Sequence, residues 1–225
     1  MPVIWIASSN PGKIAEFQLG VRLAAPKGDA PGQPPNDPPN DPWTAEPIPN
    51  FLRLPPCPEE ARTFADNAKG KAVHYSRFAE GLVFADDSGL EVDALRGAPG
   101  VKSRRFAGPG ATDADNRTKL LVLMGGVPTS MRTAVFVCEL AVARRGELLT
   151  QFRATAEGRI LTAPRGEGGF GYDSLFLDLE SEKTFAQLSP EQKLARSHRG
   201  RALRALLGWL ATQSSQQAQS ARLGR

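Results

Sequence analysis

Ala85-Asp86-Asp87-Ser88-Gly89-Leu90 is the stretch around which we expect the fold to be organised. It follows the apolar run 82–84, which predicts a short buried strand. Two adjacent carboxylates at the end of such a strand would lie at the edge of the core, where they can face a cleft. Their oxygens suit a hard cation such as Mg²⁺ and suit proton abstraction from water. The alternative is an ordinary polar turn, because Asp, Ser and Gly are common turn residues.

Length and composition indicate a soluble globular chain. The 225 residues are 40% hydrophobic and 23% charged, with a modest formal net charge of +4, and they suffice for one large domain with a sizeable core. No apolar run is long enough to span a membrane and the N-terminus lacks a signal-peptide layout, so we expect a cytoplasmic protein without membrane contact. Cys57 and Cys138 lie far apart and predict no disulfide framework, and only two histidines argue against a zinc site.

A strand, a turn and a helix open the chain. Residues 3–8 predict a buried strand, the turn Ser9-Asn10-Pro11-Gly12 follows, and a helix is expected to start near Lys13. Backbone N–H groups at a helix N-terminus attract anions, and Lys13 adds a positive charge. The turn lacks the glycine spacing and the Lys-Ser/Thr ending of a Walker A loop. It therefore predicts an anion site only weakly by itself.

A proline-rich segment interrupts this pattern. Residues 26–58 hold 12 of the 19 prolines, which disfavour both a central strand and a continuing helix. We interpret the segment as a surface insertion tethered by Trp43, Ile48, Phe51 and Leu52. It would lie within a single domain spanning residues 1–212, and the Ser/Gln/Ala-rich residues 213–225 are expected to form a frayed tail.

Regular elements are predicted on both sides of the acidic stretch. Thr63 caps a helix whose apolar stripe runs to Ala79, and another helix is expected over 112–124. Period-2 alternation predicts a strand over 132–143, and residues 148–157 read as its hairpin partner.

Two later stretches carry candidate ligand contacts. Residues 164–173 place four glycines around Phe170 and Tyr172. Such a loop can bring its backbone close to a ligand and offer an aromatic face to a base, or it can be a flexible loop packed by its own aromatics. Ser189-Pro190 then predicts a strong helix start, which places Lys193 in the first turns, before Ser197-His198-Arg199 and a terminal helix.

Taken in order, these stretches resemble the inosine triphosphate pyrophosphatase family, which hydrolyses non-standard purine nucleoside triphosphates. The resemblance spans nearly the whole chain apart from the proline-rich insertion and the tail. The matching stretches are Ser8–Lys13 with Glu16-Phe17, Thr63–Ala68 with Lys71-Ala72, Ala85–Leu90 with Val92–Leu95 and Gly97–Gly100, Pro164–Gly166 with Gly169–Asp173, and Leu188–Lys193 with Ser197–Arg199.

The resemblance implies an α/β fold with an elongated mixed β-sheet flanked by helices, and two lobes around a central active-site cleft. It implies cleavage of ITP, dITP or XTP between the α- and β-phosphates, which yields a nucleoside monophosphate and diphosphate. It also implies Mg²⁺ as the cofactor and a homodimer, with no stable nucleic-acid partner.

Site roles follow from the same resemblance. Asp87 would be the catalytic base or a metal ligand, with Asp86 and Glu60 as further metal ligands; Glu59 is the other candidate for the upstream acidic position. The expected substrate-binding residues are Ser8, Ser9, Asn10, Pro11, Gly12, Lys13, Ser88, Phe170, Gly171, Tyr172, Asp173, Lys193, His198 and Arg199. Two departures are Ser8-Ser9, where the family commonly has Thr-Gly, and Ser174, where proline is usual.

Two other functions fit parts of the sequence. A Mg²⁺-dependent pyrophosphatase of another fold would prefer pyrimidine or otherwise modified nucleotides over ITP and XTP. A nucleic-acid-binding module would exploit the basic excess, but the acidic residues are scattered through the chain and no continuous basic and aromatic stripe is present.

Overall fold

The computed structural model describes residues 2–25 and 43–223, which form a seven-stranded sheet in the order β2-β1-β3-β4-β5-β6-β7. β1 pairs parallel with β2 and β3, whereas the pairs from β3 to β7 are antiparallel. The strands are β1 (Val3–Ile6), β2 (Thr44–Pro47), β3 (Leu82–Val92), β4 (Thr133–Arg144), β5 (Glu147–Ile160), β6 (Phe176–Asp178) and β7 (Lys183–Thr184). The predicted α/β fold with a mixed sheet and flanking helices is confirmed.

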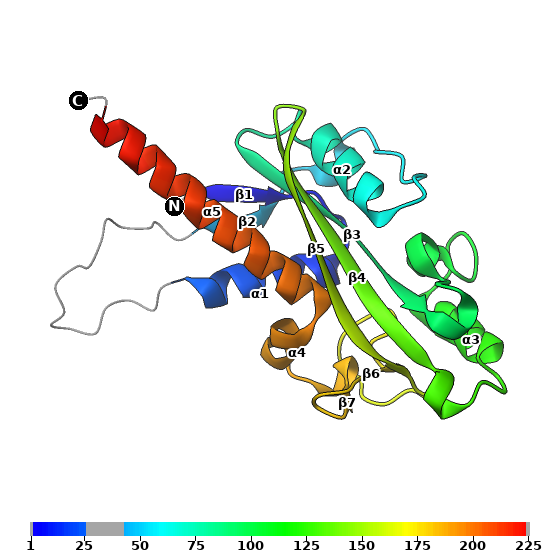
Figure 1. The fold of residues 1–225 in the computed structure, drawn as a ribbon. Coiled ribbons are helices and arrows are strands. Elements are labelled where there is room, and N and C mark those ends of the chain that lie inside the picture. The colour runs from blue at the N-terminus through cyan, green and yellow to red at the C-terminus, as the bar shows by residue number, and fades with distance from the viewer. Residues whose placement is uncertain (1, 26–42, 224–225) are drawn as a thin grey trace, which may run out of the picture.

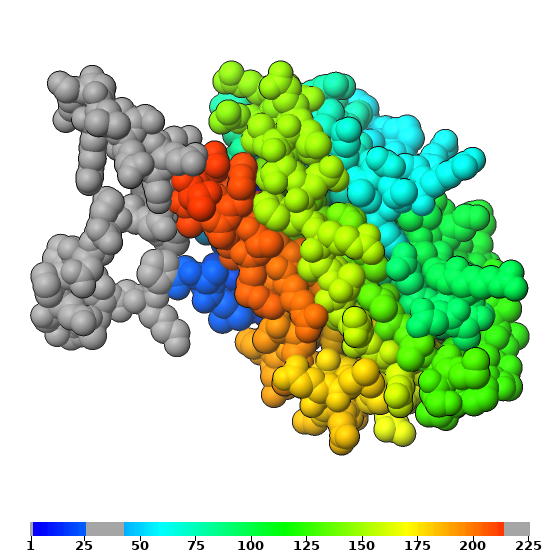
Figure 2. All heavy atoms as spheres, viewed as in Figure 1, coloured from blue at the N-terminus to red at the C-terminus, as the bar shows by residue number. Residues whose placement is uncertain are grey.

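Helices cover the sheet (Figure 1). The α-helices are α1 (Pro11–Ala24), α2 (Phe64–Tyr75), α3 (Asp113–Leu123), α4 (Pro190–Arg196) and α5 (His198–Leu223). Short 3₁₀ turns are η1 (Phe51–Arg53), η2 (Asp93–Leu95), η3 (Gly100–Arg105), η4 (Thr129–Met131) and η5 (Phe185–Gln187). α5 packs against α1, β4 and β5, and α2 packs against β3 and β4. Figure 2 shows the orange surface of α5 beside both α1 and the β4–β5 hairpin.

The long strands connect separate hydrophobic clusters. Near the N-terminal end of β3, one cluster joins Phe84 to α1 and α5, and a second joins Ala85 to α2. Near its C-terminal end, Leu90 and Val92 belong to a third cluster with α3 and β6. β3 therefore passes from one packed region to another, and the acidic stretch lies in between. The division into two lobes around a cleft stays a prediction.

The acidic stretch is not a turn, and it is not the end of a strand. β3 continues from Leu82 to Val92 through Asp86, Asp87 and Ser88, and all of these residues pair with β4. Asp and Gly have low strand propensity, but the pairing of residues 86–89 with β4 overrides it, whereas β1 pairs only with residues 82–84. The carboxylates consequently project from the middle of a central strand.

Part of the predicted surface insertion belongs to the sheet. Residues 44–47 form the edge strand β2, where a proline is tolerated because, among the described strands, only β1 pairs with it. Trp43, Ile48 and Phe51 pack on the core as expected, but Leu52 is 86% exposed and tethers nothing. The remainder of the predicted insertion, residues 26–42, lies outside the described residues.

The C-terminal elements also differ in detail from the prediction. The chain forms two helices, since α4 ends at Arg196 with Ser197 as its C-cap and α5 begins at His198. α5 is helical to Leu223, past the predicted frayed start at residue 213. The sequence contains no proline or glycine between Trp209 and Leu223 that would stop it. None of the helices in residues 2–25 and 43–223 has the length and hydropathy of a membrane span.

Candidate active site

A cavity of about 190 Å³ brings together stretches that are far apart in the sequence. The turn after β1, the middle of β3 and the loop after β5 all contribute to its wall. Its lining includes Ser8, Ser9, Asn10, Lys13, Glu59, Lys71, Asp86, Asp87, Ser88, Arg104, Arg105, Asp113, Phe170, Gly171, Tyr172, Asp173 and Arg199. Most of the predicted site residues therefore share one cavity.

The turn before α1 is held by its own side chains. Asn10 caps the helix by accepting a hydrogen bond from the Lys13 backbone N–H at 3.0 Å, and Ser8 Oγ accepts from the Asn10 N–H at 3.2 Å. Two backbone donors that we expected to be available for an anion are thus already used. The main cationic group that this turn offers is the Lys13 ammonium.

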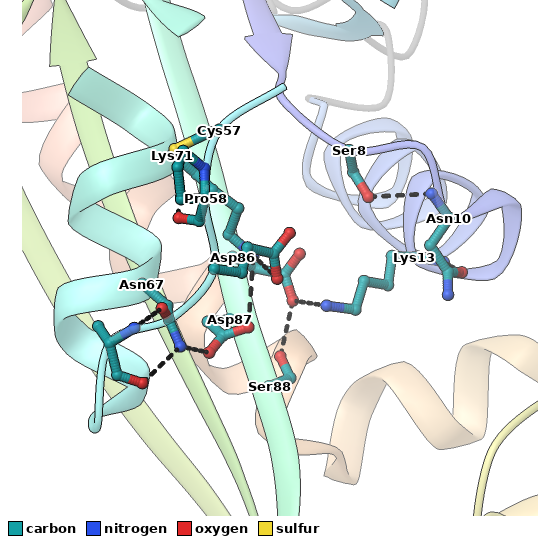
Figure 3. Close-up of polar contacts among 12 residues, drawn as sticks. Ser8, Asn10, Lys13, Cys57, Pro58, Asn67, Lys71, Asp86, Asp87 and Ser88 are labelled. Atoms are coloured by element: carbon teal, nitrogen blue, oxygen red, sulfur yellow. Dashed lines mark hydrogen bonds and ion pairs between the residues drawn. The ribbon is translucent and has the colours of Figure 1, made fainter. Parts of the chain in front are cut away.

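Asp86 holds that ammonium in place. Lys13 Nζ lies 2.7 Å from Asp86 Oδ2, and Ser88 Oγ donates to the same oxygen at 2.7 Å (Figure 3). Burial raises the pKa of Asp86, but the charges of Lys13, Arg199 and Lys71 outweigh burial and hold the pKa at about 2. Asp86 is therefore a permanent anion that positions Lys13.

Asp87 projects toward α2 instead. Its Oδ1 lies 3.3 Å from Lys71 Nζ, and its Oδ2 accepts a hydrogen bond of 3.0 Å from Asn67 Nδ2. Adjacent strand residues point to opposite faces, which is why the two neighbouring carboxylates meet lysines from different helices. Burial raises the pKa of Asp87, and the charges of Lys71 and Lys13 do not fully offset it. Asp87 is thus a more basic carboxylate than Asp86, as a proton acceptor requires.

The upstream acidic residue in the cavity is Glu59, not Glu60. Both residues are exposed, but Glu59 lines the cavity with its Oε2 3.4 Å from Lys71 Nζ, whereas Glu60 does not line it. The described residues contain no group of three or more His, Cys, Asp or Glu side chains placed to hold a metal ion. Protein Mg²⁺ sites, however, usually combine one or two carboxylates with substrate phosphates. Asp87 and Glu59, which converge on one ammonium, fit that mode.

The loop after β5 presents an aromatic ring to the cavity. The Phe170 ring has Lys193 Nζ at 4.7 Å and the Arg199 guanidinium at 4.8 Å from its centroid. Asp173 accepts a hydrogen bond from the Phe170 N–H at 2.8 Å and forms an ion pair with Lys193 at 2.5 Å. Tyr172 is buried and donates to the Ser103 backbone oxygen at 2.9 Å. Asp173 and Tyr172 therefore shape the loop that carries Phe170.

Glu16 organises the basic residues behind this ring. It pairs with Lys193 at 2.5 Å and with Arg199 at 2.9 Å. Burial raises the pKa of Glu16, but the two cations outweigh burial and lower it. The Glu16 carboxylate thus links α1 to α4 and α5 by ion pairs. It also keeps two cations beside Phe170.

Of the two neighbours His198 and Arg199, only Arg199 reaches the cavity. His198 is fully buried, stacks on Phe136 at 4.7 Å, and does not line the cavity. Neither of its ring nitrogens has a hydrogen-bond partner among the described residues. Burial, followed by the charges of Arg199, Lys193 and Lys13, lowers the pKa of His198 well below its usual value, so the ring is neutral. Its predicted substrate contact therefore stays a prediction.

Sequence reasoning missed several residues of the site. Asn67 and Lys71 appeared only within the matching stretches and received no role, yet both are buried and bond to Asp87. Their spacing of four residues, which puts both on one helical face, was the available signal. Glu16 was quoted only as part of a matching stretch. Its role depends on α4 and α5, which are remote in the sequence.

Comparisons with known proteins show the relatives of this chain. Residues 4–209 match the sequence profile of the Ham1 family. A Geobacillus kaustophilus protein named dITP/XTP pyrophosphatase is 45% identical over 203 residues, covering 90% of this chain and 91% of that protein. A Thermus thermophilus protein of the same name is 44% identical over 204 residues, covering 90% and 88% respectively. The solved structure of a HAM1 protein from Coxiella burnetii has a TM-score of 0.76 at 35% identity, covering 94% of this chain and 100% of that one.

Proposed function

We propose that this chain, which belongs to the Ham1 family, hydrolyses non-standard purine nucleoside triphosphates such as dITP, ITP and XTP. The products would be the nucleoside monophosphate and diphosphate. The observation that carries the proposal is the single cavity that joins Lys13, Asp87 and Phe170. These residues supply a cation for phosphate, a basic carboxylate and an aromatic face for a base. The names of the relatives from Geobacillus kaustophilus and Thermus thermophilus support the substrate class.

Lys13 would bind the triphosphate. Its ammonium is already oriented by Asp86 at 2.7 Å, so little reorganisation is needed when an anion arrives. Arg104 and Arg105, which line the same cavity, would add positive charge at its edge. Asp86 keeps the lysine in place, and we assign it no contact with the phosphate.

Asp87 would act as the general base. It accepts the proton from a water whose oxygen attacks the α-phosphorus. The bond from that phosphorus to the oxygen bridging to the β-phosphorus breaks, and diphosphate leaves. Asn67 and Lys71 hold the carboxylate in position from α2, and burial keeps it basic enough to accept the proton.

Asp87 and Glu59 would hold Mg²⁺ together with phosphate oxygens. When bound, the cation would neutralise phosphate charge and lower the pKa of a coordinated water. Lys71 lies within 3.3–3.4 Å of both carboxylates and would keep them close together before the metal and substrate arrive.

Base selection would use Phe170 and Arg199. Stacking on Phe170 accepts any base. The Arg199 Nε–H is buried without a hydrogen-bond partner among the described residues, and a buried unpaired donor is costly. The carbonyl at carbon 6 of hypoxanthine or xanthine would accept from such a donor, whereas the amino group of adenine would not.

A substrate panel tests the proposal. Diphosphate release from ITP, dITP, XTP, GTP, ATP and dUTP would be measured with and without Mg²⁺, alongside the Asp87→Asn variant. We expect Mg²⁺-dependent release of one diphosphate per monophosphate, fastest with ITP, dITP and XTP. Preference for dUTP, or orthophosphate as the first product, would refute it. Salt-sensitive duplex binding without any hydrolysis would favour a nucleic-acid-binding role instead.

The proposal includes a cytoplasmic homodimer without a stable nucleic-acid partner, and this part rests on the family resemblance. Light scattering after size-exclusion chromatography would test the assembly. A mass near that of one 24.2 kDa chain at working concentrations would contradict the dimer.

A further inference from the structure

Both backbone polar groups of Gly171 are held by side chains of α3. The Gly171 N–H donates to Asp113 Oδ2 at 2.6 Å, and the Gly171 carbonyl oxygen accepts from Arg117 Nη1 at 2.7 Å. Gly171 follows Phe170 directly, and it has a φ of 62°, in the left-handed region that favours glycine. Two charged side chains thus hold the peptide groups on both sides of the Gly171 Cα, beside the aromatic ring.

The start of α3 places Asp113 and Arg117 next to each other. Asp113 and Arg117 are four residues apart, so they lie on the same face of α3. Thr112 and Asp115 form a reciprocal capping box that fixes the first turn of the helix, where Asp113 lies. The Asp113 carboxylate also lines the cavity. The pair is therefore placed by a locally stable helix end.

The other anchors of this loop act on different residues. Tyr172 bonds to Ser103, and Asp173 bonds to Lys193 and to the Phe170 N–H. These contacts hold the C-terminal part of the loop and the Phe170 N–H, but they leave the Gly171 N–H and carbonyl to other partners. The Asp113–Arg117 pair holds the left-handed glycine between Phe170 and Tyr172, where glycine would otherwise allow the most backbone freedom.

We propose that Asp113 and Arg117 are positioning residues for the purine-binding part of the site. By fixing the N–H and carbonyl groups of Gly171, they set the orientation of the Phe170 ring against which the base stacks. This inference rests on the proposed function and deepens it. The two residues would affect the binding of the purine base. They would not affect the binding of the phosphates.

Two probes separate the base from the phosphates. Inosine monophosphate would report on the base part, and inorganic tripolyphosphate on the phosphate part, with both affinities measured by calorimetry. We expect Asp113→Ala and Arg117→Ala each to weaken inosine monophosphate binding roughly tenfold, the effect of losing one charge-assisted hydrogen bond. Tripolyphosphate binding should change less than about twofold. Arg117→Lys, which keeps a donor, should restore much of the loss.

Matched controls come from the same helix. Asp115→Ala removes the capping box, and Lys119→Ala removes a hydrogen bond to the Phe106 backbone oxygen, but neither residue bonds to Gly171. Lys119→Ala should bind inosine monophosphate like the parent chain. Asp115→Ala, which weakens the helix start that places Asp113, should weaken binding less than Asp113→Ala does. The double variant of Asp113 and Arg117 should lose less than the product of the single losses, because both side chains act on the backbone of one residue, Gly171.

The outcomes distinguish this inference from the proposed function. If the parent chain binds inosine monophosphate and hydrolyses ITP but the two variants bind as it does, the positioning role is overturned alone. Equal weakening of both probes, or an equal effect of Asp115→Ala, also overturns it, since helix stability would then explain the loss. If the parent chain neither binds inosine monophosphate nor hydrolyses ITP, the proposed function and this inference both fail.

Discussion

The Phe170 ring lies against Gly12, in the first turn of α1. A methyl group built on Gly12 would lie 2.5 Å from Cδ1 and 2.7 Å from Cε1 of that ring. The base-stacking residue and the turn that carries Lys13 are thus in contact, and the contact exists only because residue 12 has no side chain.

Replacing Gly12 with alanine should move Phe170. Alanine favours a helix over glycine by about 1 kcal/mol, so stability should hold or rise, while the displaced ring should raise the KM for ITP about five- to tenfold. Gly70→Ala on α2 is the matched control, because a methyl group there meets nothing within 4 Å. An unchanged KM in Gly12→Ala would show that the ring accommodates the methyl group without consequence.

Substitution of Asp86 and of Asp87 should impair hydrolysis in different ways. Asp87→Asn removes the proton acceptor, so kcat for ITP should fall about 10²–10⁴-fold, the usual contribution of a general base. Asp86→Asn removes the partner of Lys13 and should chiefly raise KM. Steady-state kinetics with circular dichroism as a folding control would check both, and equal kcat losses would contradict the separate roles.

The choice of Glu59 over Glu60 as a metal ligand can be tested by the Mg²⁺ dependence of activity. Glu59→Gln should raise the Mg²⁺ concentration needed for half-maximal activity, because one of two carboxylates is lost. Glu60→Gln, one residue away and outside the cavity, should leave that concentration unchanged. A larger effect at Glu60 would restore the assignment expected from the sequence.

His198 should make stability pH-dependent. The unfolded chain protonates this ring near pH 6.5, but the buried ring resists protonation, so the free energy of unfolding falls as the pH drops below 6.5. The loss should be about 1.4 kcal/mol per pH unit. Urea denaturation of the parent chain and His198→Leu at pH 7, 6 and 5 would measure it. Stability curves that stay parallel would contradict a buried neutral histidine.

Elements whose signals are local could be predicted from the sequence. Thr63, Thr112 and Ser189 each cap a helix within three residues, and the β4–β5 hairpin pairs neighbouring segments. The extent of β3 could not be predicted, since Asp86 to Gly89 pair with strand residues some 50 positions later in the chain. Local propensity carries no information about such a partner.

The same distinction applies to the site. The residue types in the turn before α1 and around Phe170 indicated that both stretches belong to the site, and both line the same cavity. The choice between Glu59 and Glu60, and the buried positions of Lys71 and His198, depend on how α2 and α5 pack. Packing of remote elements decides those positions, so a single sequence leaves them open.

The continuous course of β3 has a consequence for changes in chain length. Lys13 and Lys71 each meet their own carboxylate because Asp86 and Asp87 alternate between the faces of one strand. Inserting or deleting one residue between Val83 and Asp86 would reverse that alternation and exchange the two acids between the lysines. Point substitutions here alter one partner, whereas a single-codon insertion or deletion would invert the whole site. We therefore expect this strand to tolerate length changes far less than the Arg145-Gly146 turn of the β4–β5 hairpin.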